Sequence, residues 1–377
     1  MQYQLSSHGV YQDGVPSIGE RQVVPTLWEI MLLTVLTSML FAGTIRYFES
    51  YDSAVRKFGD SPAYTSVASA IRHWDFSHLQ IKQFWGYPYA MAAVSMVTRI
   101  SDENSLLLIS CASSFLSIGL AFRLWGGWVA GMFAVLNFDW MQRSFLGGAE
   151  PLAVALIFGA FLAVRHERFL LAALLASLST VVRPLGIFCL IGIALVLLRR
   201  REYKKVAFAV FIGILVGGLY VMPLARYFAD PLATVHSYQG GPLPLFGVPF
   251  YAIIKGTMLY PAPWTNLMLS FGWIVLVLAG TIMTFFDSNF RDYARNNPVE
   301  ILFVVPYLFL IFSYNLPAFA RSNFARFVIP VLPIVFVALS RWMPRDRRIL
   351  WALGFLCPIL AAASAIGIKN VVRLLGA

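Results

Sequence analysis

Apolar runs recur along the whole chain and are separated by short polar or basic stretches. Charged residues make up 12% of its 377 residues and apolar ones 59%, whereas a soluble domain carries roughly 25% and 45–50%. So few charges cannot cover the surface of a soluble enzyme, and that class of protein is excluded. We expect an all-α polytopic membrane protein with about eleven transmembrane helices. The runs long enough to cross a bilayer, or nearly so, lie at about 28–46, 105–122, 127–142, 149–164, 169–182, 185–198, 206–226, 265–286, 301–316, 327–340 and 349–367.

The net charge of +11 comes from basic residues clustered between these runs, which is the pattern of the positive-inside rule and not a nucleic-acid surface. One further run, 86–100, decides the topology. If it lies in the membrane interface and the N-terminus is cytoplasmic, every strongly basic loop faces the cytoplasm; if it spans, all later loops invert. We therefore expect an interfacial helix there, a cytoplasmic tail at 1–27, a single transmembrane domain at 28–377, and outer segments at about 47–104 and 227–264. We expect no cleaved signal peptide and no soluble domain at either end.

Acidic residues gather in the predicted outer segments, and a carboxylate in or near the bilayer usually faces a cavity and carries function. Asp60 stands just before a helical pattern that has Pro62 at its start. It either caps that helix or acts as a general base at the membrane surface, and the two roles are compatible. Glu150 follows two glycines and an alanine and opens an apolar helix, where the helix dipole favours a carboxylate and the small residues let a ligand approach. Asp139 lies inside an apolar run.

Three arginines fall on the predicted outer side, where the positive-inside rule disfavours them: Arg183, Arg321 and Arg326. One explanation is a bound anion such as a lipid phosphate, because a guanidinium offers bidentate donors to phosphate oxygens. The alternative is ion pairing with the carboxylates described above.

Cysteine and histidine give weaker indications. The cysteines lie within apolar runs and are predicted to be small core residues, not a disulfide, metal or nucleophile set: Cys111, Cys189 and Cys357. The stretch from His73 to His78 is either a metal pocket or an aromatic interfacial loop. His236, in the second outer segment, either contacts substrate or lies on a surface loop.

Four motifs occur in order on the predicted outer side: Asp60-Ser61-Pro62-Ala63-Tyr64, Phe84-Trp85-Gly86-Tyr87-Pro88, Glu150-Pro151-Leu152 and Arg326-Phe327-Val328-Ile329-Pro330-Val331-Leu332-Pro333. Through them, residues 28–340 resemble the GT-C superfamily of integral-membrane glycosyltransferases, in particular bacterial aminoarabinose transferases and protein mannosyltransferases. The resemblance implies a GT-C-like fold with amphipathic juxtamembrane helices in the first outer segment. It also implies sugar transfer, with inversion, from a polyprenyl-phosphate donor to a glycan, lipid or protein acceptor. The reaction would take place on the periplasmic or luminal face, and in a bacterium the protein would lie in the inner membrane of the cell envelope.

The chemistry of such a transfer assigns roles to the candidate residues. An acceptor hydroxyl must lose its proton, so Asp60, in the position of the family's catalytic carboxylate, is the predicted base. The leaving phosphate gains charge, so Arg183, Arg321 and Arg326 are predicted to bind it. Further substrate contacts are expected from Glu150, Tyr64 and His236. No cofactor is predicted beyond the donor substrate, and metal dependence and oligomeric state stay open.

Two other classes of function are compatible with the sequence. A sugar or lipid transporter, or flippase, would use Asp139, Glu150 and Arg183 as a substrate path, but it should show matched broken helices in two halves, and no such repeat is visible. A non-catalytic subunit of a membrane complex would tolerate the loss of Asp60.

Overall fold

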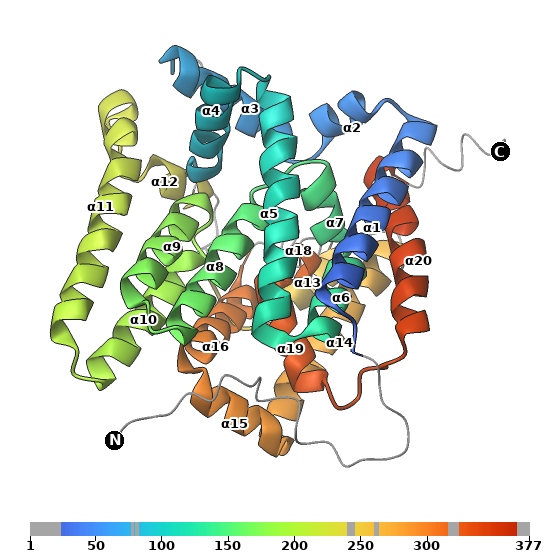
Figure 1. Cartoon of the computed structure of the whole chain (residues 1–377). Helices are drawn as coiled ribbons and strands as arrows, with labels where there is room; N and C mark the ends of the chain where they lie inside the picture. The colour runs from blue at the N-terminus through green and yellow to red at the C-terminus, as the bar shows by residue number, and fades with distance from the viewer. Residues whose placement is uncertain are drawn as a thin grey trace.

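The computed structural model describes residues 24–76, 79, 83–239, 246–259, 264–315 and 324–367, and over these residues the chain is a bundle of helices without a β-sheet (Figure 1). The longer helices are α1 (Leu27–Phe48), α5 (Asp102–Trp125), α8 (Glu150–Arg165), α11 (Tyr203–Phe228), α14 (Trp264–Phe286), α16 (Pro298–Ser313) and α20 (Arg347–Ile366). The shorter ones are α2 (Tyr51–Lys57), α3 (Ser61–His73), α4 (Gly86–Thr98), α6 (Gly127–Leu136), α7 (Phe138–Phe145), α9 (Phe169–Val182), α10 (Gly186–Arg199), α12 (Ala233–Gln239), α13 (Tyr251–Leu259), α15 (Ser288–Asn296), α18 (Phe324–Phe327), the 3-10 turn η1 (Ile329–Val331) and α19 (Leu332–Leu339).

Four helices, α1, α5, α11 and α20, are long and apolar enough to cross a membrane. Two bent pairs, α7 with α8 and α14 with α15, raise the number of candidate spans to six if each pair counts as one. Five further apolar segments have only 10–17 residues, namely α6, α9, α10, α16 and the stretch from Ile329 to Leu339. The structure therefore confirms an all-helical membrane protein. The expected number of about eleven spans stays a prediction, since it requires these shorter helices to cross as well.

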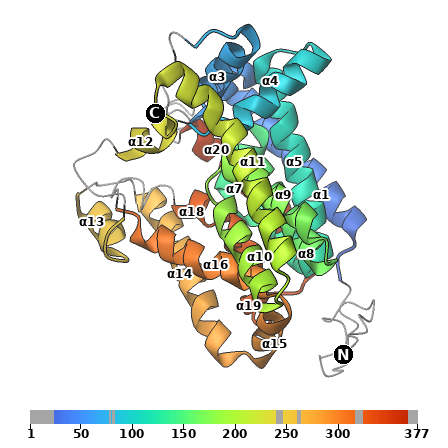
Figure 2. The same cartoon turned by 90° about the vertical axis from the view of Figure 1, so that its left-hand side faces the viewer.

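The helices α2, α3 and α4 of the first long segment form a layer at one end of the bundle, drawn at the top of Figure 1, and α15 lies at the opposite end. Figure 2 shows the same separation from the side. Helix α4 covers most of the run at 86–100 and has 13 residues. At about 1.5 Å per residue such a helix spans roughly 20 Å, which is less than the roughly 30 Å of a bilayer core. Its length fits the expected interfacial position, which the structure does not otherwise test.

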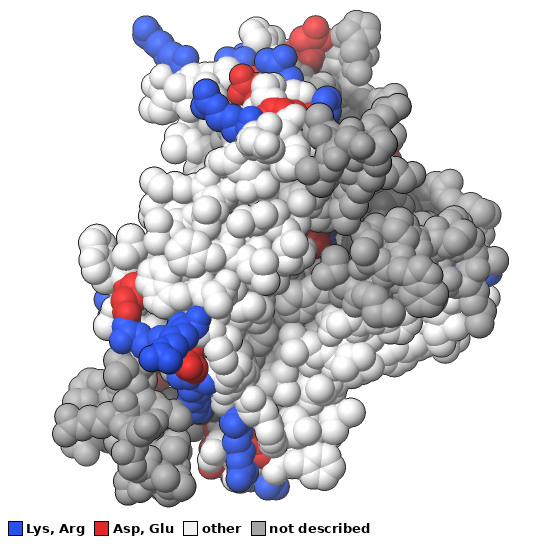
Figure 3. Space-filling view, turned by 90° about the vertical axis from the view of Figure 1, so that its right-hand side faces the viewer, with Lys and Arg blue, Asp and Glu red and all other residues white. Residues whose placement is uncertain are grey.

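Charged side chains are distributed in agreement with this arrangement. Seen from the side of α1 and α20, most of them gather toward the two ends of the molecule, and the described surface between them is mostly uncharged (Figure 3). Asp102, at the start of α5, accepts a hydrogen bond from Arg72 of α3 in the layer of α2 to α4, whereas the connection between α10 and α11 lies at the other end of the bundle (Figure 1).

The apolar run expected at 127–142 is not one helix, which corrects the sequence prediction. Asn137 interrupts it with an extended backbone and separates α6 from α7. Its side-chain oxygen accepts a hydrogen bond from the Trp140 backbone N–H at 2.9 Å, and its Nδ2 donates to the Ala325 carbonyl at 2.8 Å. Asn137 thus caps α7 and ties it to α18. Because both groups are buried and satisfied, the break is a stable feature of the bundle.

Candidate active site

The turn between α7 and α8 brings Glu150 into the interior. The two helices meet at 106°, and Gly147 in the turn has a φ of +100°, a conformation that favours glycine. A Cβ at this position would also lie 1.8 Å from a methyl group of Leu106. The sequence Gly-Gly-Ala before Glu150 is therefore required by the sharp bend, and the bend places Glu150 at the first position of α8 with its side chain only 6% exposed.

Two arginines from distant parts of the chain meet at Glu150. Arg183, which follows α9 in an extended conformation, and Arg326, on α18, both donate to Glu150 Oε1. The other carboxylate oxygen, Oε2, is enclosed and has no hydrogen-bond partner among the described residues. The structure thus brings three predicted site residues together and confirms the ion-pairing alternative for Arg183 and Arg326.

Asp60 joins the same cluster from α3. Arg326 Nη2 donates to Asp60 Oδ2 at 2.8 Å, so Arg326 bridges the two carboxylates. Asp60 occupies the N-cap position of α3, and its backbone carbonyl accepts from the Tyr64 N–H at 3.0 Å, but its side chain makes no capping bond. The suggested capping role of the carboxylate is therefore wrong, because the carboxylate is turned toward the arginines instead.

The charge state of Asp60 follows from this setting. Burial alone would raise the pKa of its carboxyl group, but the positive charges of Arg326, Arg183 and Arg143 outweigh burial and hold the pKa below its usual value. Asp60 is therefore ionised at neutral pH and able to accept a proton. Its side chain is 33% exposed, so it is also the more accessible of the two carboxylates.

Arg143 is a member of the cluster that sequence reasoning missed. It lies on α7 with its side chain 8% exposed, and its Nη1 is 4.0 Å from Asp60 Oδ2. Its guanidinium carbon lies 4.7 Å from the centre of the Phe58 ring. An arginine three residues from a run of small residues resembles a charge flanking a membrane span. Its position follows from the break at Asn137 before α7 and the bend at Gly147 after it.

Tyr64, on α3, lines the cluster from the side of the outer layer. Its side chain is buried, and burial raises the pKa of its hydroxyl to about 12, so it stays protonated. The ring packs edge-on against Tyr87 of α4, with 5.1 Å between the ring centres. Tyr87 is itself fixed by a hydrogen bond to the Leu106 carbonyl at 2.8 Å. The residues of two sequence motifs are thereby held against each other beside the charged cluster.

The remaining predicted residues lie elsewhere. His236, on α12, is exposed and contacts Asp230 at 2.8 Å, and no described contact joins it to Asp60 or Glu150. Asp139 is half-buried on α7 and forms no ion pair with a described residue. Arg321 and His78 lie outside the described residues, and among those that are described no group of three or more His, Cys, Asp or Glu side chains has the geometry of a metal site. The cysteines Cys189 and Cys357 are buried, Cys111 is half-buried, and all are free.

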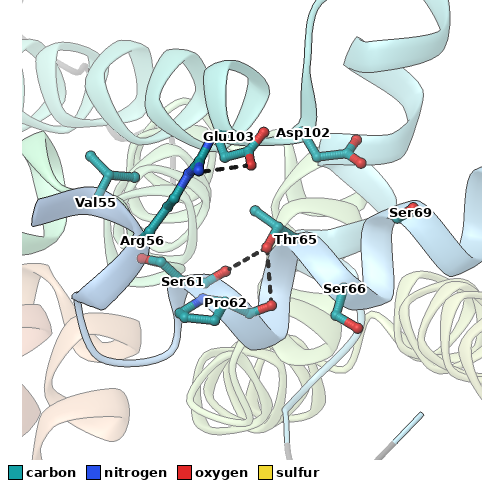
Figure 4. Close-up of a pocket in the computed structure, with 9 residues that line it drawn as sticks. All are labelled: Val55, Arg56, Ser61, Pro62, Thr65, Ser66, Ser69, Asp102 and Glu103. Carbon is teal, nitrogen blue, oxygen red and sulfur yellow. Dashed lines mark hydrogen bonds and ion pairs between the residues drawn. The ribbon is translucent and has the colours of Figure 1, made fainter. Parts of the chain in front are cut away.

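A groove of about 550 Å³ lies next to this cluster, between α2, α3 and the start of α5 (Figure 4). Seven of the nine residues that line it are polar or charged: Arg56, Ser61, Thr65, Ser66, Ser69, Asp102 and Glu103. Ser61 Oγ also lies 3.4 Å from the Leu146 carbonyl, in the turn that leads to Glu150. Asp60, a member of the arginine cluster, directly precedes Ser61, which lines the groove.

Comparisons with known proteins were made by sequence and by structure. No protein-family model matches the sequence, and no curated protein matches it. Among solved structures, the chain is similar to the crystal structure of ArnT from Cupriavidus metallidurans bound to undecaprenyl phosphate, with a TM-score of 0.51 and 13% sequence identity. The match covers 93% of this chain and 71% of that one. At this identity the likeness shows the fold, so the chain has the GT-C-like membrane fold that its motifs predict.

Proposed function

We propose that this protein is a membrane glycosyltransferase that moves a sugar from a polyprenyl-phosphate donor to a hydroxyl acceptor at the outer face of the membrane. The observation that carries the proposal is the bridge made by Arg326, which holds an accessible carboxylate, Asp60, beside a buried cluster of guanidinium groups. Such a site pairs a proton acceptor with groups that stabilise a leaving phosphate. The similarity in fold to a protein that was crystallised with undecaprenyl phosphate supports the same class of donor.

In the proposed reaction Asp60 accepts the proton of the acceptor hydroxyl. At the same time the oxygen of that hydroxyl forms a bond to the anomeric carbon of the donor sugar. The bond between that carbon and the phosphate oxygen breaks, and the lipid phosphate leaves with the electron pair. Arg183 and Arg326 supply positive charge on the phosphate side, and Glu150 Oε2, which has no partner among the described residues, accepts a hydrogen bond from a sugar hydroxyl. Attack from the face opposite the phosphate inverts the anomeric centre.

The surroundings of the site suit the two substrates. The polar groove next to Ser61 offers hydroxyl and carboxylate groups to a glycan or another hydroxyl-bearing acceptor (Figure 4). The prenyl chain requires an apolar path, and the helices below the outer layer present apolar side chains to their surroundings, among them Phe208, Ile214 and Leu219 of α11. In a bacterium this arrangement corresponds to an inner-membrane protein whose site faces the periplasm.

Mass spectrometry and turnover of the full-length protein test the proposal. Native mass spectrometry of the detergent-purified protein should show an adduct with the mass of a polyprenyl phosphate or of its sugar-linked form. Incubation with a lipid extract from the source cells, together with a cell-envelope fraction as acceptor, should then convert polyprenyl-phosphate sugar to polyprenyl phosphate. Asp60→Asn is the matched control, which should bind the lipid and convert none of it.

The other outcomes are equally decisive. A protein that binds the lipid sugar and carries it between vesicle leaflets without consuming it would be a transporter, and the proposal would be wrong. A protein that neither binds nor consumes a prenyl-phosphate lipid would point to a non-catalytic role.

A further inference from the structure

We infer that Arg143 forms an anion-binding site that takes a phosphate group; within the proposed function, on which this assignment rests, it is the phosphate of the donor. Arg183 and Arg326, two of the three arginines expected for this role from the sequence, both donate hydrogen bonds to Glu150. Arg143 does not. Its Nε and Nη1 are enclosed and have no hydrogen-bond partner among the described residues, and Asp60 Oδ2, at 4.0 Å, is beyond hydrogen-bond distance.

A buried guanidinium with unused donors is costly unless a ligand completes it. Taking a charged group out of water is unfavourable, and leaving its N–H groups unpaired adds to that cost. The side chain of Arg143 is 8% exposed, so bulk solvent reaches little of it. An anion would supply the missing partners.

The backbone around Arg143 is shaped to hold it in this position. A Cβ at Gly148 would lie 2.8 Å from Arg143 Cδ, and a Cβ at Gly59 would lie 2.9 Å from Arg143 Nη1. The Phe58 ring, next to Gly59 in the chain, also packs against the guanidinium. Two separate loops, one before α3 and one before α8, therefore approach the side chain as closely as glycine allows. An arginine that only flanked a membrane span would not need two glycine-containing loops packed against its side chain.

The position of the guanidinium selects the class of anion. It lies 4.0 Å from Asp60 Oδ2, so an oxyanion bound to it is adjacent to the proposed base. Its planar fork of donors matches the tetrahedral oxygens of phosphate. A phosphate joined to a sugar would place the anomeric carbon within reach of an acceptor oxygen that Asp60 deprotonates. Free phosphate offers the same oxygens, so the two sources have to be separated by experiment.

Asp139 is the alternative partner that must be tested. It lies one turn before Arg143 on α7 and acts on it electrostatically, but the two form no ion pair. If Arg143 served only to balance Asp139, then Asp139→Asn would disturb the protein as much as Arg143→Gln does.

Binding measurements with the full chain in detergent decide between these possibilities, with undecaprenyl phosphate and inorganic phosphate titrated in separate arms. We expect Arg143→Gln to weaken undecaprenyl phosphate binding by about 10–100-fold, the usual effect of losing a charge-assisted hydrogen bond. Arg143→Lys should recover part of this loss, and Asp139→Asn should bind like the parent. Arg123→Gln, at an exposed position on α5, is the matched surface control.

Inorganic phosphate should compete with the lipid phosphate in the parent protein and much less in Arg143→Gln. Equal binding of undecaprenyl phosphate by the parent and Arg143→Gln would overturn the assignment, while the proposed function would stand or fall separately on the turnover of Asp60→Asn. Binding of inorganic phosphate through Arg143 without any binding of the lipid would confirm the anion site and contradict the lipid donor. A loss in Asp139→Asn equal to that in Arg143→Gln would also overturn the assignment, since it would make Asp139 the partner.

Discussion

Two buried carboxylate clusters lie at the two ends of α8, and they differ in whether both oxygens of the central carboxylate have hydrogen-bond partners among the described residues. At the start of α8, Glu150 is held by Arg183 and Arg326; at its end, Arg165 binds Glu300 of α16. Glu300 is 2% exposed, and both of its oxygens accept hydrogen bonds. Arg165 Nε donates to Oε1 at 2.9 Å, Trp125 Nε1 donates to Oε2 at 3.0 Å, and the Tyr293 hydroxyl also donates to Oε2.

At Glu150, in contrast, one oxygen accepts from both guanidinium groups, whereas the other oxygen and the Nε groups of Arg143 and Arg183 have no hydrogen-bond partner in the part of the chain that the structure describes. Both clusters join distant helices, so both stabilise the bundle. Arg165 Nη2 also makes no hydrogen bond, but it lies 2.7 Å from Glu300 Oε1, so of the two described clusters the one at the start of α8 alone keeps an unpaired carboxylate oxygen. A buried polar network that is satisfied indicates a structural role, and one that is left incomplete beside an accessible carboxylate indicates a binding site.

The largest expected difference between the clusters at the two ends of α8 is in the effect of substitutions on the transfer rate. Asp60→Asn removes the proton acceptor but keeps its size, so the transfer rate should fall by about 10²–10⁴-fold, the usual contribution of a positioned base. Folding and lipid binding should persist, because the side chain does not cap α3. A detergent melting curve provides the folding control. Parental turnover in Asp60→Asn would remove Asp60 from the catalytic role and with it the contrast between the clusters.

Substitutions in the Glu300 cluster should lower the stability of the protein and leave the transfer rate unchanged. Glu300→Ala leaves Arg165 without its carboxylate and removes the shared acceptor of Trp125 and Tyr293, so we expect a loss of about 3 kcal/mol in the free energy of unfolding. Turnover per folded molecule should be unchanged, because this cluster lies at the end of the bundle away from Asp60. Thermal unfolding in detergent, followed by an activity assay on the folded fraction, measures both. A folded Glu300→Ala protein with impaired transfer would show that the two ends are coupled.

Features of the fold and the site that depend on neighbouring residues in the chain could be predicted from the sequence, whereas features that depend on contacts distant in sequence could not. The helices were predictable because bilayer-length apolar runs leave the backbone no other way to satisfy its hydrogen bonds. The division of the run at 127–142 was not, because Asn137 breaks it through a contact with the Ala325 carbonyl, far away in sequence. Asp60, Glu150, Arg183 and Arg326 were predictable as a set, since charges on the outer side of a membrane protein need partners.

The pairing within that set and the presence of Arg143 were not predictable. Arg143 is two residues from the end of α7, in a segment that resembles an ordinary basic flank. Its role depends on the 106° bend at Gly147, which points α7 across the bundle. The two adjacent glycines before Glu150 were the available signal. Two glycines at a helix start indicate that another part of the protein approaches the backbone closely, but they do not identify the side chain that does so.

The pH dependence of transfer is the next test of the incomplete cluster. Burial raises and the arginines lower the pKa of Asp60, with the lowering dominant, so activity should be retained on acidification until below the usual carboxyl range near about 3.9. Arg326→Gln removes the largest lowering contribution, so the acid limb of the rate profile should move to higher pH. The same linkage makes the contribution of Asp60 to stability present above the unfolded-state pKa and lost as the pH falls through its folded-state pKa. An acid limb that Arg326→Gln leaves in place would show that another group titrates.

The smallest expected effect compares one hydroxyl at each end. Tyr293→Phe removes a donor to the buried Glu300 carboxylate and should cost about 1–2 kcal/mol in unfolding free energy without changing transfer. Tyr64→Phe removes a hydroxyl that makes no hydrogen bond with a described residue, while its ring keeps the edge-on contact with Tyr87. It should therefore leave the melting temperature unchanged, and if Tyr64 contacts substrate as the sequence motif predicts, it should weaken undecaprenyl phosphate binding or raise KM by several-fold. Melting curves and binding titrations on the two variants check both halves of the comparison. A destabilised Tyr64→Phe protein with parental binding would make that side of the cluster structural, like the other, and confine the ligand site to Asp60 and the arginines.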